Sequence, residues 1–235
     1  MDKIKKIFNI LKNDYSLRVF VIAIFSLLST IILSIFNLAF GIIHGTSWNI
    51  AISFYYLTLV AFRVYIFIFE SRMRFKDEKY KEKRRMKNYI VYGIFLLILD
   101  ITLIWPISLI QLGKKGIYIN NIYTIIFAAY TFYRLGLAIY NLIKTKKGNY
   151  NLSVRLLRIL SFSTVLVSIM NLQSMLILSF GSYDKDMMIL TTVDSLAIWC
   201  LLIGISIYTY RKGIKLKNEE EMNEIEDIIS HGPNK

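Results

Sequence analysis

Four charged residues stand inside segments that are otherwise apolar, and they are the residues of this chain best placed to do chemistry. A charge at the centre of a bilayer costs about 2.5–3.5 kcal/mol on insertion scales, so such residues pair, reach water or serve a function. We therefore take the four as a candidate intramembrane site: Arg63, Asp100, Arg134 and Asp194.

Asp100 is the most informative of the four, because its short side chain cannot reach water from the middle of a span. It stands about 12 residues from either end of the apolar segment 89–112. Three states would meet its electrostatic demand: an ion pair with Arg63 or Arg134 that fixes the helix order, a proton or cation site, or a neutral hydrogen-bonded acid. The sequence leaves all three open.

The other three charges have easier routes to water. Arg63 lies about seven residues from the cytoplasmic end of its segment, roughly 10 Å at 1.5 Å per residue, and Arg134 lies a little deeper. Their long side chains could extend to the interface. Asp194 lies about seven residues below the outer end of its segment, where an outer vestibule could hydrate it.

Polar and aromatic side chains from several segments share the expected depth of Asp194. They predict either an outer cavity or a set of hydrogen bonds between helices, each worth around 0.6 kcal/mol. The candidate cavity lining is Asn37, Tyr55, Tyr56, Asn171 and Gln173.

The elements that must position these residues are membrane spans. The chain has 235 residues, 55% of them hydrophobic and only 19% charged, with a mean hydropathy of +0.49. Apolar runs of about 20 residues can each cross a hydrocarbon core roughly 30 Å thick. We expect an all-α polytopic membrane protein with six transmembrane helices, at about 17–43, 48–69, 89–112, 118–142, 155–180 and 187–210.

The charge distribution predicts the orientation of the chain. The net charge is +13, and 24 of the 29 Lys and Arg residues fall on one side of the six-span arrangement or at its span ends. This is the positive-inside pattern, so we expect a multi-pass protein of the cell membrane with both termini in the cytoplasm. Its basic inner loop 71–88 should attract anionic lipid headgroups, and nucleic acid is not an expected partner.

Turn glycines suggest how the spans pair. Gly45, Gly116 and Gly181 are spaced by 71 and 65 residues, and Arg63 and Arg134 each follow one of them by 18 residues. We expect three outward-facing helical hairpins, with a threefold pseudo-repeat as one explanation. Alternating topology alone would space the turns evenly as well.

Two charged segments flank the transmembrane domain 17–210. Segment 1–16 is basic and amphipathic, which predicts an interfacial helix or a frayed tail. Segment 211–235 is a charged cytoplasmic tail with a run of acidic residues, which is either solvated or bound to the basic loop or to a protein partner.

Two sets of residues resemble a family of six-span membrane proteins from Gram-positive bacteria. The first is Asn37-Leu38, Gly45, Ser47-Trp48, Tyr55-Tyr56 and Arg63. The second is Tyr130, Tyr133-Arg134, Leu172-Gln173, Met175-Leu176 and Phe180-Gly181. The resemblance implies bacterial origin and six spans, and it implies no activity.

No catalytic or cofactor motif is present, and two histidines, His44 and His231, cannot build a histidine metal cluster. We therefore expect no catalytic residue, cofactor or metal. The leading expectation is a small transporter, channel or solute-binding membrane subunit for an unknown solute or ion, with Asp100 as the coupling residue if transport is ion-coupled. The alternative is a receptor, immunity or assembly subunit acting through the basic loop and acidic tail, and an intramembrane enzyme ranks third.

Overall fold

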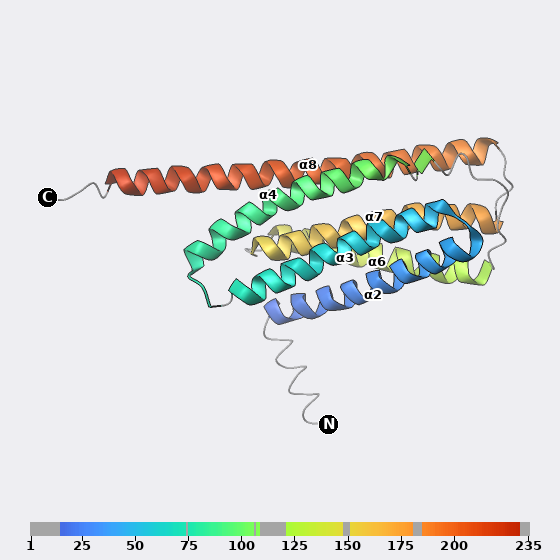
Figure 1. Cartoon of the computed structure of the whole chain (residues 1–235), viewed down its shortest axis with the longest axis horizontal. Coiled ribbons are helices and arrows are strands. Elements are labelled where there is room, and N and C mark those ends of the chain that lie inside the picture. The colour runs from blue at the N-terminus through green and yellow to red at the C-terminus, as the bar shows by residue number, and fades with distance from the viewer. Residues whose placement is uncertain are drawn as a thin grey trace, which may run out of the picture.

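A computed structural model describes residues 15–73, 75–105, 107–108, 121–147, 151–180 and 185–230, and all regular structure within them is α-helical. The all-α class is therefore confirmed. The helices are α2 (Tyr15–His44), α3 (Ser47–Met73), α4 (Glu78–Thr102), α6 (Asn121–Lys147), α7 (Leu152–Phe180) and α8 (Lys185–Ser230), shown in Figure 1.

Five of these helices are long and apolar enough to cross a membrane, which supports the expected membrane protein. The apolar stretches are Ala23–His44, Ser47–Met73, Asn121–Thr145, Leu152–Ile177 and Ile189–Asn223. α4 is not among them, because its last 18 residues include Arg85, Lys87 and Asp100. The outer end of the expected span 89–112 lies outside the described residues, so the sixth span stays a prediction.

The first two helices form the turn that the sequence predicts. Gly45 has a φ of 65°, in the left-handed region that glycine adopts without strain. The amide of Thr46 donates a hydrogen bond to the Gly41 carbonyl (2.9 Å). A Cβ on Gly41 would lie 2.6 Å from the Ile50 side chain, so a glycine is needed for the close approach of α2 and α3.

The later helices pair differently from the expected hairpins. α4 runs antiparallel along α8, and α6 runs along α7 (Figure 1). Gly116 and Gly181, the other two turn glycines, lie outside the described residues. The three-hairpin arrangement and its pseudo-repeat are therefore not confirmed.

Two glycines explain why α4 lies so close to α8. A Cβ on Gly93 of α4 would stand 2.7 Å from the backbone of Tyr210, and a Cβ on Gly213 of α8 would stand 2.7 Å from the Ile90 side chain. Small residues of this kind let two helix backbones approach closely within a membrane. The side of α4 that carries Gly93 is thus buried against α8, the last helix of the chain.

We expect Gly93→Leu to separate α4 from α8 and to lower the free energy of unfolding by at least about 1–3 kcal/mol, as overpacking does. Unfolding by a denaturing detergent, followed by circular dichroism, would measure it. Gly204→Leu in α8 is the matched control, because a Cβ there meets nothing within 4 Å. Equal stability of the two variants would contradict this account of the α4–α8 contact.

α7 is the central helix of the bundle. Of its most apolar window, 67% is buried, against 22–39% for the other four candidate spans. It contacts α2, α3, α4, α6 and α8. Polar groups brought by these neighbours can therefore meet at its surface.

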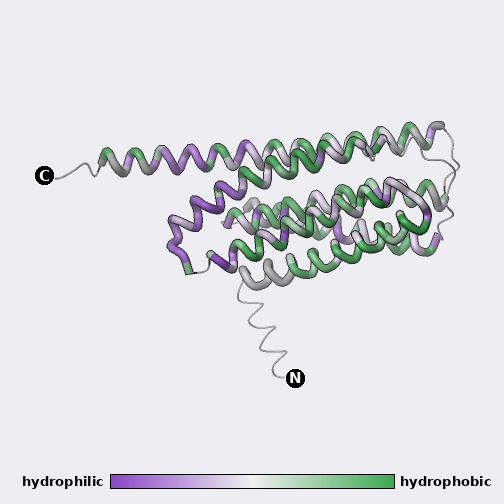
Figure 2. Tube along the Cα trace, viewed as in Figure 1, coloured by the Kyte–Doolittle hydropathy of each residue, from purple (hydrophilic) through white to green (hydrophobic). Residues whose placement is uncertain are grey.

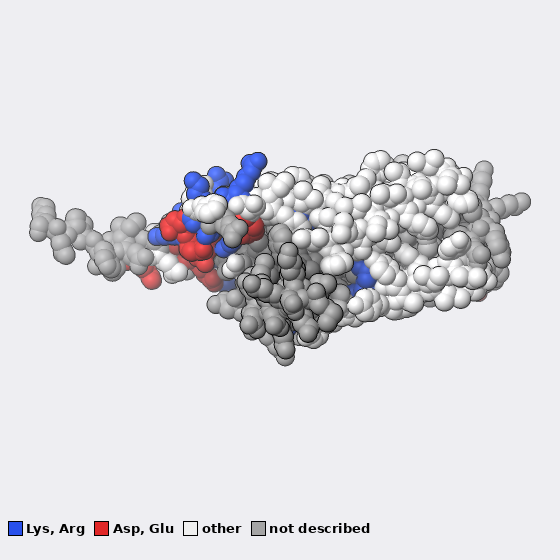
Figure 3. Space-filling view, turned by 90° about the horizontal axis from the view of Figure 1, so that it is seen from below, with Lys and Arg blue, Asp and Glu red and all other residues white. Residues whose placement is uncertain are grey.

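Charge gathers at one end of the molecule. Hydrophilic residues concentrate where α3 joins α4 and along the far part of α8 (Figure 2), and the space-filling view shows Lys, Arg, Asp and Glu at that same end (Figure 3). α8 continues past the expected span as one helix to Ser230. The tail 211–230 is thus helical, whereas residues 1–14 of the expected N-terminal segment 1–16 lie outside the described residues.

Candidate functional site

Asp100 joins three helices through neutral donors. Its side chain is 1% exposed. The hydroxyl of Tyr55 in α3 donates to Oδ1 (3.0 Å), and the hydroxyl of Ser206 in α8 donates to Oδ2 (2.5 Å). The Trp199 indole of α8 donates to the Asp100 backbone carbonyl (2.8 Å). The carboxyl group therefore pins α4 between α3 and α8.

Arg63 of α3 joins α2 and α7 and is also 1% exposed. Its Nη1 donates to the Ser26 carbonyl (3.0 Å) and to Oγ1 of Thr30 (2.8 Å). Its Nη2 donates to the Leu160 carbonyl (3.1 Å) and to Oγ1 of Thr164 (2.7 Å). Each side of the guanidinium group thus holds one carbonyl and one hydroxyl of a neighbouring helix.

The structure places Arg63 in neither of its two expected settings. Among the described residues, no ion pair involves Arg63 or Asp100. The guanidinium group is also buried among hydrogen-bond acceptors rather than extended to the interface. Its positive charge therefore lies inside the bundle without a carboxylate partner.

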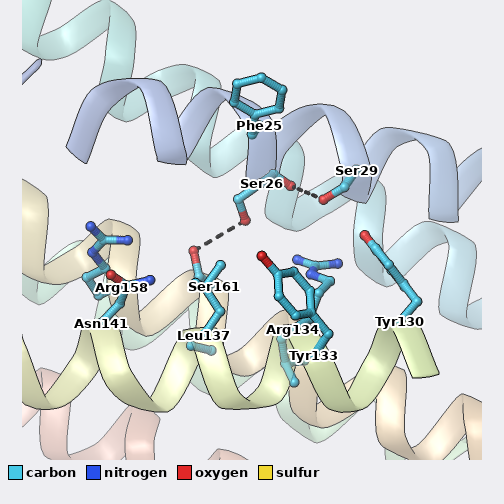
Figure 4. A pocket seen from close by; sticks show the side chains of 12 residues that line it. Phe25, Ser26, Ser29, Tyr130, Tyr133, Arg134, Leu137, Asn141, Arg158 and Ser161 are labelled. Carbon is cyan, nitrogen blue, oxygen red and sulfur yellow. Dashed lines mark hydrogen bonds between the residues drawn. The ribbon is translucent and has the colours of Figure 1, made fainter. Parts of the chain in front are cut away.

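A groove of about 450 Å³ opens beside this charge, between α2 and α6, with α7 as its floor (Figure 4). We call it the arginine groove. Arg134 from α6 and Arg158 from α7 both line it, and none of the described residues that line it is Asp or Glu. The described residues that line it are Phe25, Ser26, Ser29, Tyr130, Tyr133, Arg134, Leu137, Ala138, Asn141, Arg158, Ser161 and Val165.

Arg134 has unused hydrogen-bonding capacity in the groove. Its side chain is only 8% exposed, its Nη1 has no hydrogen-bond partner, and its Cζ lies 5.7 Å from the centre of the Tyr130 ring. A buried donor without a partner costs about 1–3 kcal/mol, and more when it is charged. The arrangement suits a guest that carries negative charge.

Arg63 adds a third positive charge close to the groove. Ser26 is shared between the two sites, since its carbonyl binds Arg63 and the residue also lines the groove. The hydroxyls of Ser26 and Ser161 meet across the floor at 3.5 Å (Figure 4). Two guanidinium groups therefore line the groove, and a third lies beside it.

The remaining predicted residues form contacts between helices and do not line the arginine groove. Nδ2 of Asn171 donates to Oδ1 of Asn37 (2.8 Å), and both side chains are buried. Nε2 of Gln173 donates to Oδ2 of Asp194 (3.1 Å). These contacts match the hydrogen-bonding alternative for the polar residues in the expected outer half.

Tyr55 and Tyr56 are likewise buried, at 2% and 0% exposed. Tyr55 belongs to the Asp100 contacts, and the hydroxyl of Tyr56 lies 3.0 Å from that of Ser168 in α7. Both tyrosines thus carry their hydroxyls to partners on other helices.

Sequence reasoning missed a polar cluster at the charged end. Arg85 of α4 donates from Nε and Nη2 to the two carboxylate oxygens of Glu70 in α3 (2.9 and 2.8 Å), and Ser153 of α7 donates to the same carboxylate. The hydrogen bonds to Glu70 raise the pKa of Arg85 above its ordinary value. The sequence does carry a signal for this cluster, because Glu70 directly follows an apolar segment and precedes the basic loop 71–88.

No protein-family model, curated protein or solved structure matches this chain. The resemblance to a six-span bacterial family stays a prediction. In the described part of the chain, no group of three or more His, Cys, Asp or Glu residues could hold a metal ion. Function must therefore be argued from the geometry of the polar sites.

Proposed function

We propose that the chain is a six-span protein of the cell membrane. It binds an anionic solute in the arginine groove and transports this solute across the membrane. This places it in the class of small transporters and solute-binding membrane subunits. The observation that carries the proposal is Nη1 of Arg134, a buried charged donor without a partner in a groove that no acid of the described ranges lines.

The depth of the charges supports transport. Arg158 lies six residues from the start of α7 and Arg134 lies 13 residues from the end of α6, roughly 9 Å and 20 Å at 1.5 Å per residue. Both of these helix ends lie at the charged end of the molecule (Figure 1). A graded series of positive charges can draw an anion away from the interface, because low-dielectric walls strengthen its field.

The charge pattern supports the orientation. The basic end of the bundle carries the α3–α4 connection and the continuation of α8 (Figures 2 and 3), and positive loops stay in the cytoplasm. We therefore propose cytoplasmic termini and place the arginine groove in the inner half of the membrane.

We expect Arg134→Gln to abolish or weaken anion binding about tenfold or more, because charge-assisted hydrogen bonds are the strong ones. The full chain in an uncharged detergent would be titrated with phosphate, pyrophosphate and dodecyl phosphate, and its thermal midpoint followed. At least one anion should stabilise the wild type and stabilise the variant less.

Arg84→Gln is the matched control for this experiment, since Arg84 is an exposed arginine whose Nε donates to the hydroxyl of exposed Tyr80. Counterflow of the stabilising anion across proteoliposomes would then separate a transporter from a binding subunit. If no anion of the panel stabilises the wild type, the proposal is wrong.

One observation favours the alternative, a non-transporting interaction protein. α8 carries the ion pairs Lys215–Glu219 (3.7 Å) and Lys217–Glu221 (3.3 Å) and exposes apolar side chains further on, at Met222, Ile225 and Ile229. A helix with exposed apolar side chains beyond the bundle suits a protein partner. A partner captured by the full chain and lost on removal of 218–235 would favour this alternative.

A further inference from the structure

We propose that the arginine groove takes the phosphate headgroup of an anionic lipid of the inner leaflet, which enters sideways between α2 and α6. This inference rests on the proposed function, because it names the class of anion that the groove binds. Three features of the groove carry it: where it opens, what lines it, and how deep its charges lie.

The groove opens on the side of the bundle. Its walls come from α2 and α6, which both pack against α7, and its rim side chains Phe25 and Tyr133 are each 69% exposed. In a membrane, the sides of a helical bundle contact acyl chains. A guest that enters through this opening must carry an apolar part.

The groove lining combines apolar and charged side chains, as a lipid combines apolar tails with a charged headgroup. Leu137, Ala138 and Val165 offer apolar contacts, whereas Arg134 offers a guanidinium donor without a partner and Arg158 adds a second positive charge. A guanidinium group binds phosphate oxygens through paired donors, which a single ammonium group cannot do. A phosphate headgroup would satisfy Nη1 of Arg134 while its tails stay in the bilayer.

The depths of the two arginines match a headgroup that moves inward from the inner interface. Arg158 and Asn141 lie nearest the charged end, and Arg134 lies about two turns deeper on α6. A water-soluble anion at Arg134 would stand in a groove that opens to hydrocarbon, without its hydration shell. A lipid already has its tails in the bilayer and moves only its headgroup from the interface into the groove. Its desolvation therefore costs less than that of a water-soluble anion.

The test is a binding titration of the full chain in an uncharged detergent. The probes are dioctanoyl phosphatidic acid, dioctanoylglycerol (the same tails without phosphate) and inorganic phosphate. Binding would be followed by native mass spectrometry and by the thermal midpoint. We expect phosphatidic acid to bind at least about tenfold more tightly than either of the other probes, because only this probe combines tails with a phosphate.

Variants separate the groove from general attraction to a basic surface. Arg134→Gln should weaken binding of phosphatidic acid about tenfold or more, and Arg84→Gln less than about twofold. Ser29→Leu fills the groove from α2 without removing a charge and should also weaken binding, which covers the case in which Arg134→Gln does not fold.

The outcomes that would overturn the lipid inference are distinct. If phosphate binds as tightly as phosphatidic acid, the ligand is a soluble anion, and the proposed function survives without the lipid. If Arg84→Gln weakens binding as much as Arg134→Gln does, the lipid binds the basic end and not the groove. If neither phosphatidic acid nor inorganic phosphate binds, the lipid inference is wrong, and if pyrophosphate and dodecyl phosphate also leave the wild type unchanged, the proposed function is wrong as well.

Discussion

An Asp100→Leu variant is expected to lose about 2–6 kcal/mol of unfolding free energy. The Tyr55 and Ser206 hydroxyls both donate to this carboxyl group inside the bundle. Leucine would leave both hydroxyls without an acceptor, and each buried polar group left without a partner costs about 1–3 kcal/mol. The loss should appear as separation of α4 from α3 and α8, because the three helices meet at this group.

Asp100→Asn is the matched control, because its amide oxygen can still accept one hydroxyl and its size is unchanged. It should retain most of the stability. Unfolding in mixed micelles with a denaturing detergent, followed by circular dichroism and by tryptophan fluorescence, would measure both variants. If Leu is tolerated as well as Asn, the hydrogen bonds of Asp100 do not hold these helices together.

The sequence predicted the helices well, because apolar length is a local property of the chain. It also singled out Arg63, Asp100 and Arg134, since a charge within an apolar run is visible without a structure. The partners of these charges could not be predicted. They depend on which helices are neighbours. The packing of α4 on α8 rests on close approaches at Gly93 and Gly213, and nothing in the sequence distinguishes these two glycines from the others.

The arginine groove could not be predicted either, because it also depends on which helices are neighbours. In the sequence, Arg158 is a charge at the start of a span, and Ser26 and Ser29 are polar residues that a span tolerates at little cost in free energy. Only the packing of α2 and α6 on α7 brings them beside Arg134. The pairing of Arg63 with Asp100, one of the settings that the sequence left open, is not seen for a related reason. Neutral hydroxyls and carbonyls on α2 and α7 accept hydrogen bonds from both Nη atoms of Arg63, and such groups carry no distinctive signal in a sequence.

We expect Arg63→Met to leave the fold intact, with an unfolding free energy that is unchanged or up to about 4 kcal/mol higher. Removing the guanidinium group does not strand its hydroxyl acceptors. Thr30 already donates to the Ser26 carbonyl (2.7 Å), and Thr164 already donates to the Leu160 carbonyl (2.7 Å). The variant also removes a buried charge that has no carboxylate partner, and methionine fills much of the space.

The same variant should bind anions more weakly, because a positive charge beside the groove is lost. Two charges 10 Å apart interact by about 1.7 kcal/mol at an effective dielectric constant of 20, so a weakening of up to about 15-fold is expected for the anion that stabilises the wild type. Arg63→Lys is the control: it keeps the charge but cannot reach both helices as the planar fork does. It should bind the anion better than Arg63→Met.

Arg63→Met should therefore weaken anion binding without lowering the unfolding free energy, and that combination distinguishes a functional charge from a structural one. Thermal midpoints without the anion measure stability, and the rise in midpoint on adding the anion measures binding. A charge kept at a cost in stability is expected where it serves binding. If Arg63→Met instead unfolds the protein while Arg63→Lys does not, the guanidinium group holds α2 and α7 together, and its role in binding loses its support.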